Sequence, residues 1–121
     1  MRHGLTPAPL PAHMRDMSDT LFRLEQTIRA RRGADPSTSY VAKLTSRGRG
    51  KIAQKLGEEA TETVIAALTE DTKALTGEAA DLLFHLLVLM ADCDLPLQAV
   101  LAELDAREGV SGIAEKAARK E

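Results

Sequence analysis

Apolar residues recur every three or four positions along most of the chain, and no stretch shows the alternation that predicts a β-strand. This pattern predicts four helices, at about residues 18–32, 51–69, 72–91 and 96–107. Ser18 or Asp19 can cap the first helix, and Pro96 stands in the first turn of the last, where proline is tolerated. We therefore expect an all-α fold, a four- to five-helix bundle.

The two ends of the chain differ from this pattern. The first 16 residues contain three of the five prolines and lack the apolar stretch of about 7 to 15 residues that a secretory signal carries. We expect residues 1–16 to be a disordered extension and residues 17–121 to form a single domain, because a chain of 121 residues suffices for one core. The tail from Ile113 to Glu121 is expected to add at most a partial helix.

A cationic segment follows the first predicted helix. Gly33 and Pro36 indicate a turn, and we expect a loop to begin at Ser39 and Tyr40. From position 43 to position 55 the chain has basic residues and no acid, namely Lys43, Arg47, Arg49, Lys51 and Lys55. A solvated loop would have this composition, but glycines next to basic side chains at a helix start are also what a phosphate site requires.

The helix predicted at 51–69 carries every charged residue of its first half on one face. At about 100° per residue they fall within an arc of about 100°. These residues are Lys51, Lys55, Glu58, Glu59 and Glu62. A charged face is typical of any amphipathic helix that meets solvent, so this feature alone does not indicate a site.

The helix predicted at 72–91 is apolar around almost its whole circumference, which indicates the buried centre of the bundle. Glu78, Asp81 and His85 nevertheless share one stripe of it, about 60° wide. Because burying ionised carboxylates without a partner is costly, and the neighbouring helix adds three more acids, the pattern favours a bound cation. For His85 itself we favour a core histidine that is hydrogen-bonded to a carboxylate or a backbone carbonyl.

The five acids indicate a hard divalent cation. All of them offer oxygen, no cysteine lies near them, and one histidine is too few for the paired Glu-x-x-His ligands of a di-iron bundle. We expect Mg²⁺, with Mn²⁺ as a substitute, and the expected ligands are Glu59, Glu62, Glu78 and Asp81. Glu58 either completes the ligand set or accepts the proton of an attacking water.

Charge and composition limit the possible partners. A net charge of -2 and a pI near 5.9 give no general attraction to nucleic acid or to an anionic membrane. The longest apolar run, Leu82–Ala91, is shorter than the roughly 20 residues of a membrane span, so we expect no transmembrane segment. A single cysteine, Cys93, favours a cytoplasmic location. Aromatic residues make up only 2% of the chain, and such a thin core favours completion by homodimerisation.

The acids and their neighbours resemble a known family. Glu58-Glu59-Ala60-Thr61-Glu62 and Glu78-Ala79-Ala80-Asp81 are similar to the E-E-x-x-E and E-x-x-D signature of the all-α nucleotide pyrophosphohydrolases. From about residue 18 onward the chain resembles one branch, the phosphoribosyl-ATP pyrophosphatase family. The segments that carry this resemblance are Asp19–Leu21, Ser39–Tyr40, Lys55–Glu62, Asp81–Val88 and Ser111–Lys116.

The resemblance implies hydrolysis of phosphoribosyl-ATP to phosphoribosyl-AMP and pyrophosphate, the second step of histidine biosynthesis, by a homodimer. Lys51 and Lys55 are then expected to meet the polyphosphate, and Lys43 with Arg47 to hold the ribosyl phosphate. Two alternatives stay open, a housekeeping nucleoside triphosphate pyrophosphohydrolase of the same superfamily and a non-catalytic helical dimerisation module. Neither pattern nor resemblance assigns a role to Arg49.

Overall fold

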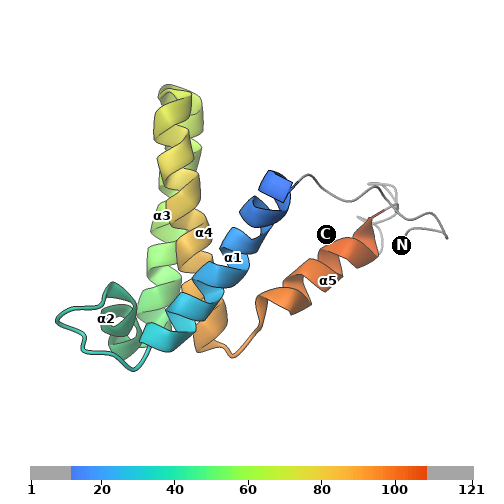
Figure 1. Cartoon of the computed structure of the whole chain (residues 1–121). Coiled ribbons are helices and arrows are strands. Elements are labelled where there is room, and N and C mark those ends of the chain that lie inside the picture. Colours follow the sequence, from blue (N-terminus) through green and yellow to red (C-terminus); the bar gives the residue numbers. More distant parts are fainter. Residues whose placement is uncertain (1–11, 109–121) are drawn as a thin grey trace.

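The computed structural model describes residues 12–108, and within them the chain forms five helices and no strand. The helices are α1 (Ala12–Arg31), α2 (Tyr40–Arg47), α3 (Arg49–Thr69), α4 (Thr72–Asp92) and α5 (Leu97–Arg107). Figure 1 shows α3 and α4 side by side as a long hairpin, with α1 and α2 against its lower part and α5 leading away from that end. Within residues 12–108 the all-α class is confirmed and five helices fall in the expected range of four to five, although α2 is not one of the four whose positions were predicted.

The prediction that a loop begins at Ser39 and Tyr40 is wrong, because α2 occupies this segment. The Ser39 side chain caps the helix by accepting a hydrogen bond of 3.1 Å from the Ala42 backbone N–H. The apolar positions of α2 are buried against the hairpin, whereas its basic residues are exposed. The pattern missed this helix because it has only eight residues, and Gly48, with φ of 95°, separates it from α3.

The first helix begins at Ala12, earlier than the predicted start at residue 18. Residues 12–16, which we expected to be disordered, are therefore helical, and the expected domain boundary at residue 17 lies inside α1. No proline lies between Pro11 and the end of α1 at Arg31, and the first helical residues include good helix formers such as Ala12 and Met14. Residues 1–11 and the tail with its predicted partial helix lie outside the described residues.

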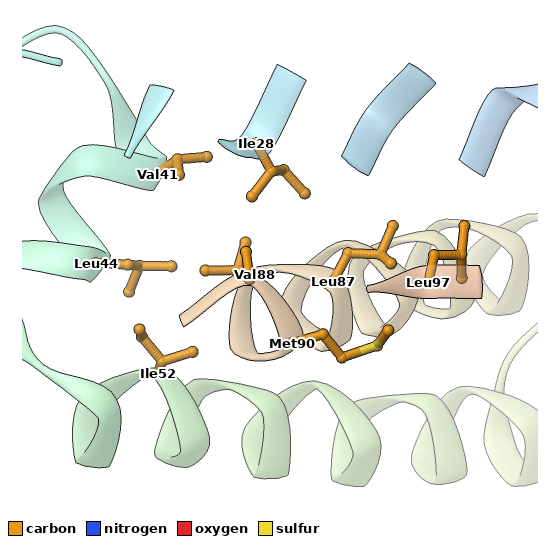
Figure 2. Close-up of a cluster of buried hydrophobic side chains, with 9 residues drawn as sticks. Ile28, Val41, Leu44, Ile52, Leu87, Val88, Met90 and Leu97 are labelled. Carbon is orange, nitrogen blue, oxygen red and sulfur yellow. The ribbon is translucent and has the colours of Figure 1, made fainter. Parts of the chain in front are cut away.

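The buried core lies where all the helices meet, at the lower end of the hairpin. It is aliphatic, as the composition predicted, with one methionine and no aromatic ring among the buried residues that form it. Figure 2 shows its side chains converging from α1, α2, α3, α4 and the start of α5: Ile28, Val41, Leu44, Ile52, Leu87, Val88, Met90 and Leu97. This core fixes the first half of α3 against the second half of α4.

The helix predicted to be the buried centre, α4, is only partly covered. In length and composition it could cross a membrane, and it is the only such helix in residues 12–108. Leu83 and Leu86 are exposed on it, while His85 and Val88 are buried. A helix that carries three acids, a lysine and a histidine and packs along α3 is better explained as a core helix with one uncovered face than as a membrane span.

Candidate active site

Three of the predicted acids come together where α3 faces α4. Glu59, Glu78 and Asp81 each offer a carboxylate oxygen, and these atoms lie within 4.8 Å of one another. Glu59 is buried, and the Oε1 atoms of Glu59 and Glu78 have no hydrogen-bond partner in the part of the chain that the structure describes. Two buried oxygens without partners are costly unless something positive faces them. The donor set therefore fits a hard divalent cation.

The backbone beneath these acids is fastened by one side chain. The Thr63 hydroxyl donates to the carbonyl oxygen of Glu59 at 2.7 Å and lies 3.2 Å from that of Glu78. Because Glu59 lies on α3 and Glu78 on α4, this shared donor sets the spacing of the two helices at the acids themselves. Such an arrangement holds the backbone that carries these two carboxylates at a fixed spacing before any ligand binds.

Burial and the neighbouring acids together shift the pKa of one acid. Burial raises the pKa of the Glu78 carboxyl, and the nearby charges of Glu62 and Glu59 raise it further. Glu62 therefore lies beside Glu78, although it is not one of the three acids whose oxygens converge. A cation bound among these groups would remove the repulsion and lower that pKa.

Glu58 faces a different part of the molecule from the three-acid group. Its carboxylate accepts a hydrogen bond of 2.9 Å from the Gln54 amide and lies 3.3 Å from the ammonium of Lys55. These contacts, the Gln54 bond first, hold the pKa of the Glu58 carboxyl below its ordinary value. Lys55 also lies 3.7 Å from Glu59, so its ammonium stands between Glu58 and the three-acid group.

All four basic residues predicted to bind substrate line one pocket of about 230 Å³, which we call the basic pocket. Its lining is Tyr40, Lys43, Leu44, Arg47, Lys51, Lys55 and Glu58. Within the described residues Lys43, Arg47 and Lys51 form no ion pair, so their charges are available to a ligand. The pocket offers concentrated positive charge, and Lys55 joins it to Glu59 of the three-acid group.

Arg49 belongs to a separate structural contact. Its Nε lies 2.8 Å from a carboxylate oxygen of Asp92, and its Nη2 donates to the Asp92 carbonyl at 2.9 Å. The residue thus ties the beginning of α3 to the end of α4 and does not line the basic pocket. A cation at the C-terminus of α4 also complements the helix dipole.

His85 is a buried histidine bonded to a backbone carbonyl, as expected. Its Nδ1 lies 2.7 Å from the Asp81 carbonyl oxygen, which can only accept, so Nδ1 carries a proton. The Tyr40 hydroxyl lies 2.9 Å from Nε2 and donates to it in the neutral ring. Sequence reasoning assigned no role to Tyr40, and only its place in the resembling Ser39–Tyr40 segment pointed to it.

Comparison with known proteins identifies the family to which the chain is similar. Residues 21–108 match the family model described as phosphoribosyl-ATP pyrophosphohydrolase. A phosphoribosyl-ATP pyrophosphatase of Rhizorhabdus wittichii is 68% identical over 85% of this chain and 97% of its own length. Proteins of the same name from Novosphingobium aromaticivorans and Azospirillum brasilense are 65% and 61% identical, over 84% and 83% of this chain and 94% and 90% of theirs.

Proposed function

Because the chain belongs to the phosphoribosyl-ATP pyrophosphohydrolase family, it hydrolyses phosphoribosyl-ATP to phosphoribosyl-AMP and pyrophosphate, and we propose that the facing sides of α3 and α4 carry this reaction. The observation that supports this site most directly is the pair of buried, unpartnered oxygens on Glu59 and Glu78. They lie next to a pocket whose cations can receive phosphate groups.

We propose that Glu59, Glu78 and Asp81 hold Mg²⁺, with Mn²⁺ as a substitute, and that Glu62 supports them from its place beside Glu78. The ion would supply neutralisation of phosphate charge and a bound water of lowered pKa. Thr63 keeps the two ligand-bearing helices at a fixed spacing, so the carboxylates do not have to reorganise when the substrate arrives.

Glu58 is better suited to proton transfer than to the ligand set. It lines the basic pocket and does not join the three acids whose oxygens converge. The contacts with Gln54 and Lys55 hold its pKa below the ordinary value, so the carboxylate is ionised at neutral pH but is a weaker base than a free one, and the proposed role rests on its position in the pocket.

The basic residues divide into two groups by the helix that carries them, α3 or α2. Lys55 touches Glu59, and Lys51 precedes it by one turn, so these two are placed to meet the polyphosphate. Lys43 and Arg47 come from α2 on the other wall. Lys43 is placed to meet the second phosphate-bearing end of the substrate, and Arg47, which lines only the basic pocket, is placed to meet the polyphosphate.

We further propose that the active form is a cytoplasmic homodimer. An apolar groove of about 190 Å³ runs between α1, α4 and α5, and Leu83, Leu86 and Leu104 are exposed in it. Val64, Ile65 and Leu68 are exposed on the far half of α3. A second copy would cover both surfaces, which one chain leaves in contact with water.

The direct test is pyrophosphate release from phosphoribosyl-ATP with Mg²⁺ by the wild type and by Glu59→Gln and Asp81→Asn. Glu70→Gln serves as the matched control, because Glu70 is an exposed carboxylate at the end of the same helix as Glu59. We expect turnover to collapse in the first two variants and to persist in the control. Full turnover in Glu59→Gln and Asp81→Asn would exclude the three-acid group as the reaction centre.

A further inference from the structure

Tyr40 has a stacked and partly exposed ring, which plays no part in the proposed hydrolysis by the three-acid group. Its ring lies with its centroid 6.1 Å from that of Phe84 at an interplanar angle of 25°, so one side is stacked. The residue is nevertheless 47% exposed. An aromatic ring with one side packed and the rest open is a ready surface for a second ring.

The orientation of this ring is fixed from behind. The Tyr40 hydroxyl donates to His85, whose own ring stands edge-on to it at 81° and donates in turn to the Asp81 carbonyl. Tyr40 on α2 is thereby tied to α4 beside a carboxylate of the three-acid group. A ring held in this way loses little entropy when it receives a ligand.

Tyr40 is also a wall shared by two pockets. One is the basic pocket, and the other is an open pocket of about 560 Å³, formed by residues 36–40 and Lys43, which we call the loop pocket. Lys43 is the second residue common to both. A ligand that fills both pockets must therefore pass Tyr40 and Lys43.

Phosphoribosyl-ATP has a matching order of parts. Its triphosphate is at one end, the adenine is in the middle, and the additional phosphoribosyl group is attached to the adenine ring. The triphosphate must lie on the side of the acids, which is the basic pocket, because Lys55 joins that pocket to Glu59. The phosphoribosyl group is then left with the loop pocket.

We propose that the adenine of phosphoribosyl-ATP stacks on Tyr40, with the triphosphate in the basic pocket and the phosphoribosyl group in the loop pocket beside Lys43. Tyr40 is then the residue that selects the base, and His85 is a positioning residue that holds its ring. This assignment rests on the proposed function of the three-acid group, because that group decides which end of the substrate lies in which pocket.

The chain itself carries a probe for this contact, because Tyr40 is its one tyrosine and it has no tryptophan. Phosphoribosyl-AMP, added with EDTA present, reports binding of the base without hydrolysis or metal. We expect saturable quenching of tyrosine fluorescence, corrected for nucleotide absorption with free tyrosine, and no quenching by ribose 5-phosphate. Calorimetric binding of phosphoribosyl-AMP without any fluorescence change would overturn the stacking proposal.

Kinetics of two substitutions give an independent test. Tyr40→Leu removes the ring and is expected to raise KM for phosphoribosyl-ATP about tenfold, with kcat changed far less. Tyr40→Phe keeps the ring but loses the bond to His85, and a rise of about threefold is expected. An unchanged KM in Tyr40→Leu contradicts the proposal. If the three-acid group binds Mg²⁺ as proposed, Mg²⁺ should still raise the melting temperature of both variants, so failure of the Tyr40 proposal is distinguishable from failure of the three-acid group.

Discussion

The lower and upper halves of the α3–α4 hairpin differ in what covers them. In the lower half, Ile52 and Val88 are 0% and 1% exposed beneath α1 and α2. In the upper half, Val64 and Leu68 are 57% and 79% exposed although they lie on the same helix as Ile52. One chain thus completes its core at one end of the hairpin only, and the acids lie where covered and uncovered halves meet.

The largest effect is expected at that junction. Glu59→Gln or Asp81→Asn should lower kcat by at least about a hundredfold, because each removes a charge that acts on the transition state. Since both acids serve one centre, the double variant should be scarcely slower than either single variant. Steady-state pyrophosphate release measures this, and strictly multiplicative losses would show that the acids act separately.

Stability should separate the two halves next. Ile52→Ala leaves a cavity in the lower core and should reduce the free energy of unfolding by about 2 to 5 kcal/mol. Leu68→Ala, on the exposed upper half, should cost less, and its cost should grow with protein concentration if a partner covers it. Urea denaturation at two concentrations measures both. A concentration-independent loss in Leu68→Ala as large as that in Ile52→Ala would erase the contrast between the halves.

A charge on the upper half tests the proposed partner. Leu68→Glu should weaken self-association by at least about tenfold, because a buried interface does not accept an unpaired carboxylate. Thr27→Glu, an exposed change on α1 beside the lower half, is the control. Sedimentation equilibrium gives the dissociation constants. If Leu68→Glu associates like the wild type, the upper half is not the dimer interface.

Substitution of two arginines in the lower half should change different quantities, KM for Arg47 and stability for Arg49. Arg47→Ala should raise KM by the equivalent of about 1 to 3 kcal/mol, since a charge-assisted phosphate contact is lost. Arg49→Ala should leave KM unchanged and reduce stability only slightly, because the Arg49 side of its ion pair with Asp92 is exposed to solvent. Kinetics and thermal melting of the two variants check this. A rise in KM for Arg49→Ala would place that arginine at the substrate.

The smallest effect concerns pH. The folded chain binds the Glu78 proton more tightly than the ordinary carboxyl pKa of 4.5 implies, so without metal its stability contribution is lost as pH rises from 4.5 through the raised pKa. Glu78→Gln should remove this slope, whereas Glu70→Gln should keep it. Mg²⁺ should stabilise the wild type increasingly over the same pH range. Calorimetric melting temperatures in EDTA and in Mg²⁺ measure both changes.

The grouping of the acids was predictable because helix geometry fixes it. Glu78 and Asp81 are separated by three positions and therefore share a face, and Glu59 lies on the helix that pairs with theirs. Glu58 was not separable from Glu59 by the same argument, because an arc of about 100° includes both. The contacts of Glu58 with Gln54 and Lys55 decide its direction, and these are local competitions that a helical pattern does not contain.

Helix α2 and the contact of Tyr40 with His85 could not be predicted from the sequence for a related reason. A helix of eight residues offers little more than two turns of periodicity, and its basic residues point away from the core. The bond from Tyr40 to His85 joins residues 45 positions apart. Such a contact depends on how α2 folds back against α4, which only the tertiary arrangement determines.

The joint at Gly48 has a consequence for how this segment can vary between relatives. Its φ of 95° turns the chain sharply, so that Arg47 lines the basic pocket while Arg49 reaches Asp92. A side chain at position 48 would be strained in this conformation, whereas Gly50 lies within a helix and has open space around its missing Cβ. We therefore expect other residues to be tolerated at position 50 and not at position 48. Position 50 is free to drift to alanine, and position 48 is constrained by the geometry that gives two neighbouring arginines separate tasks.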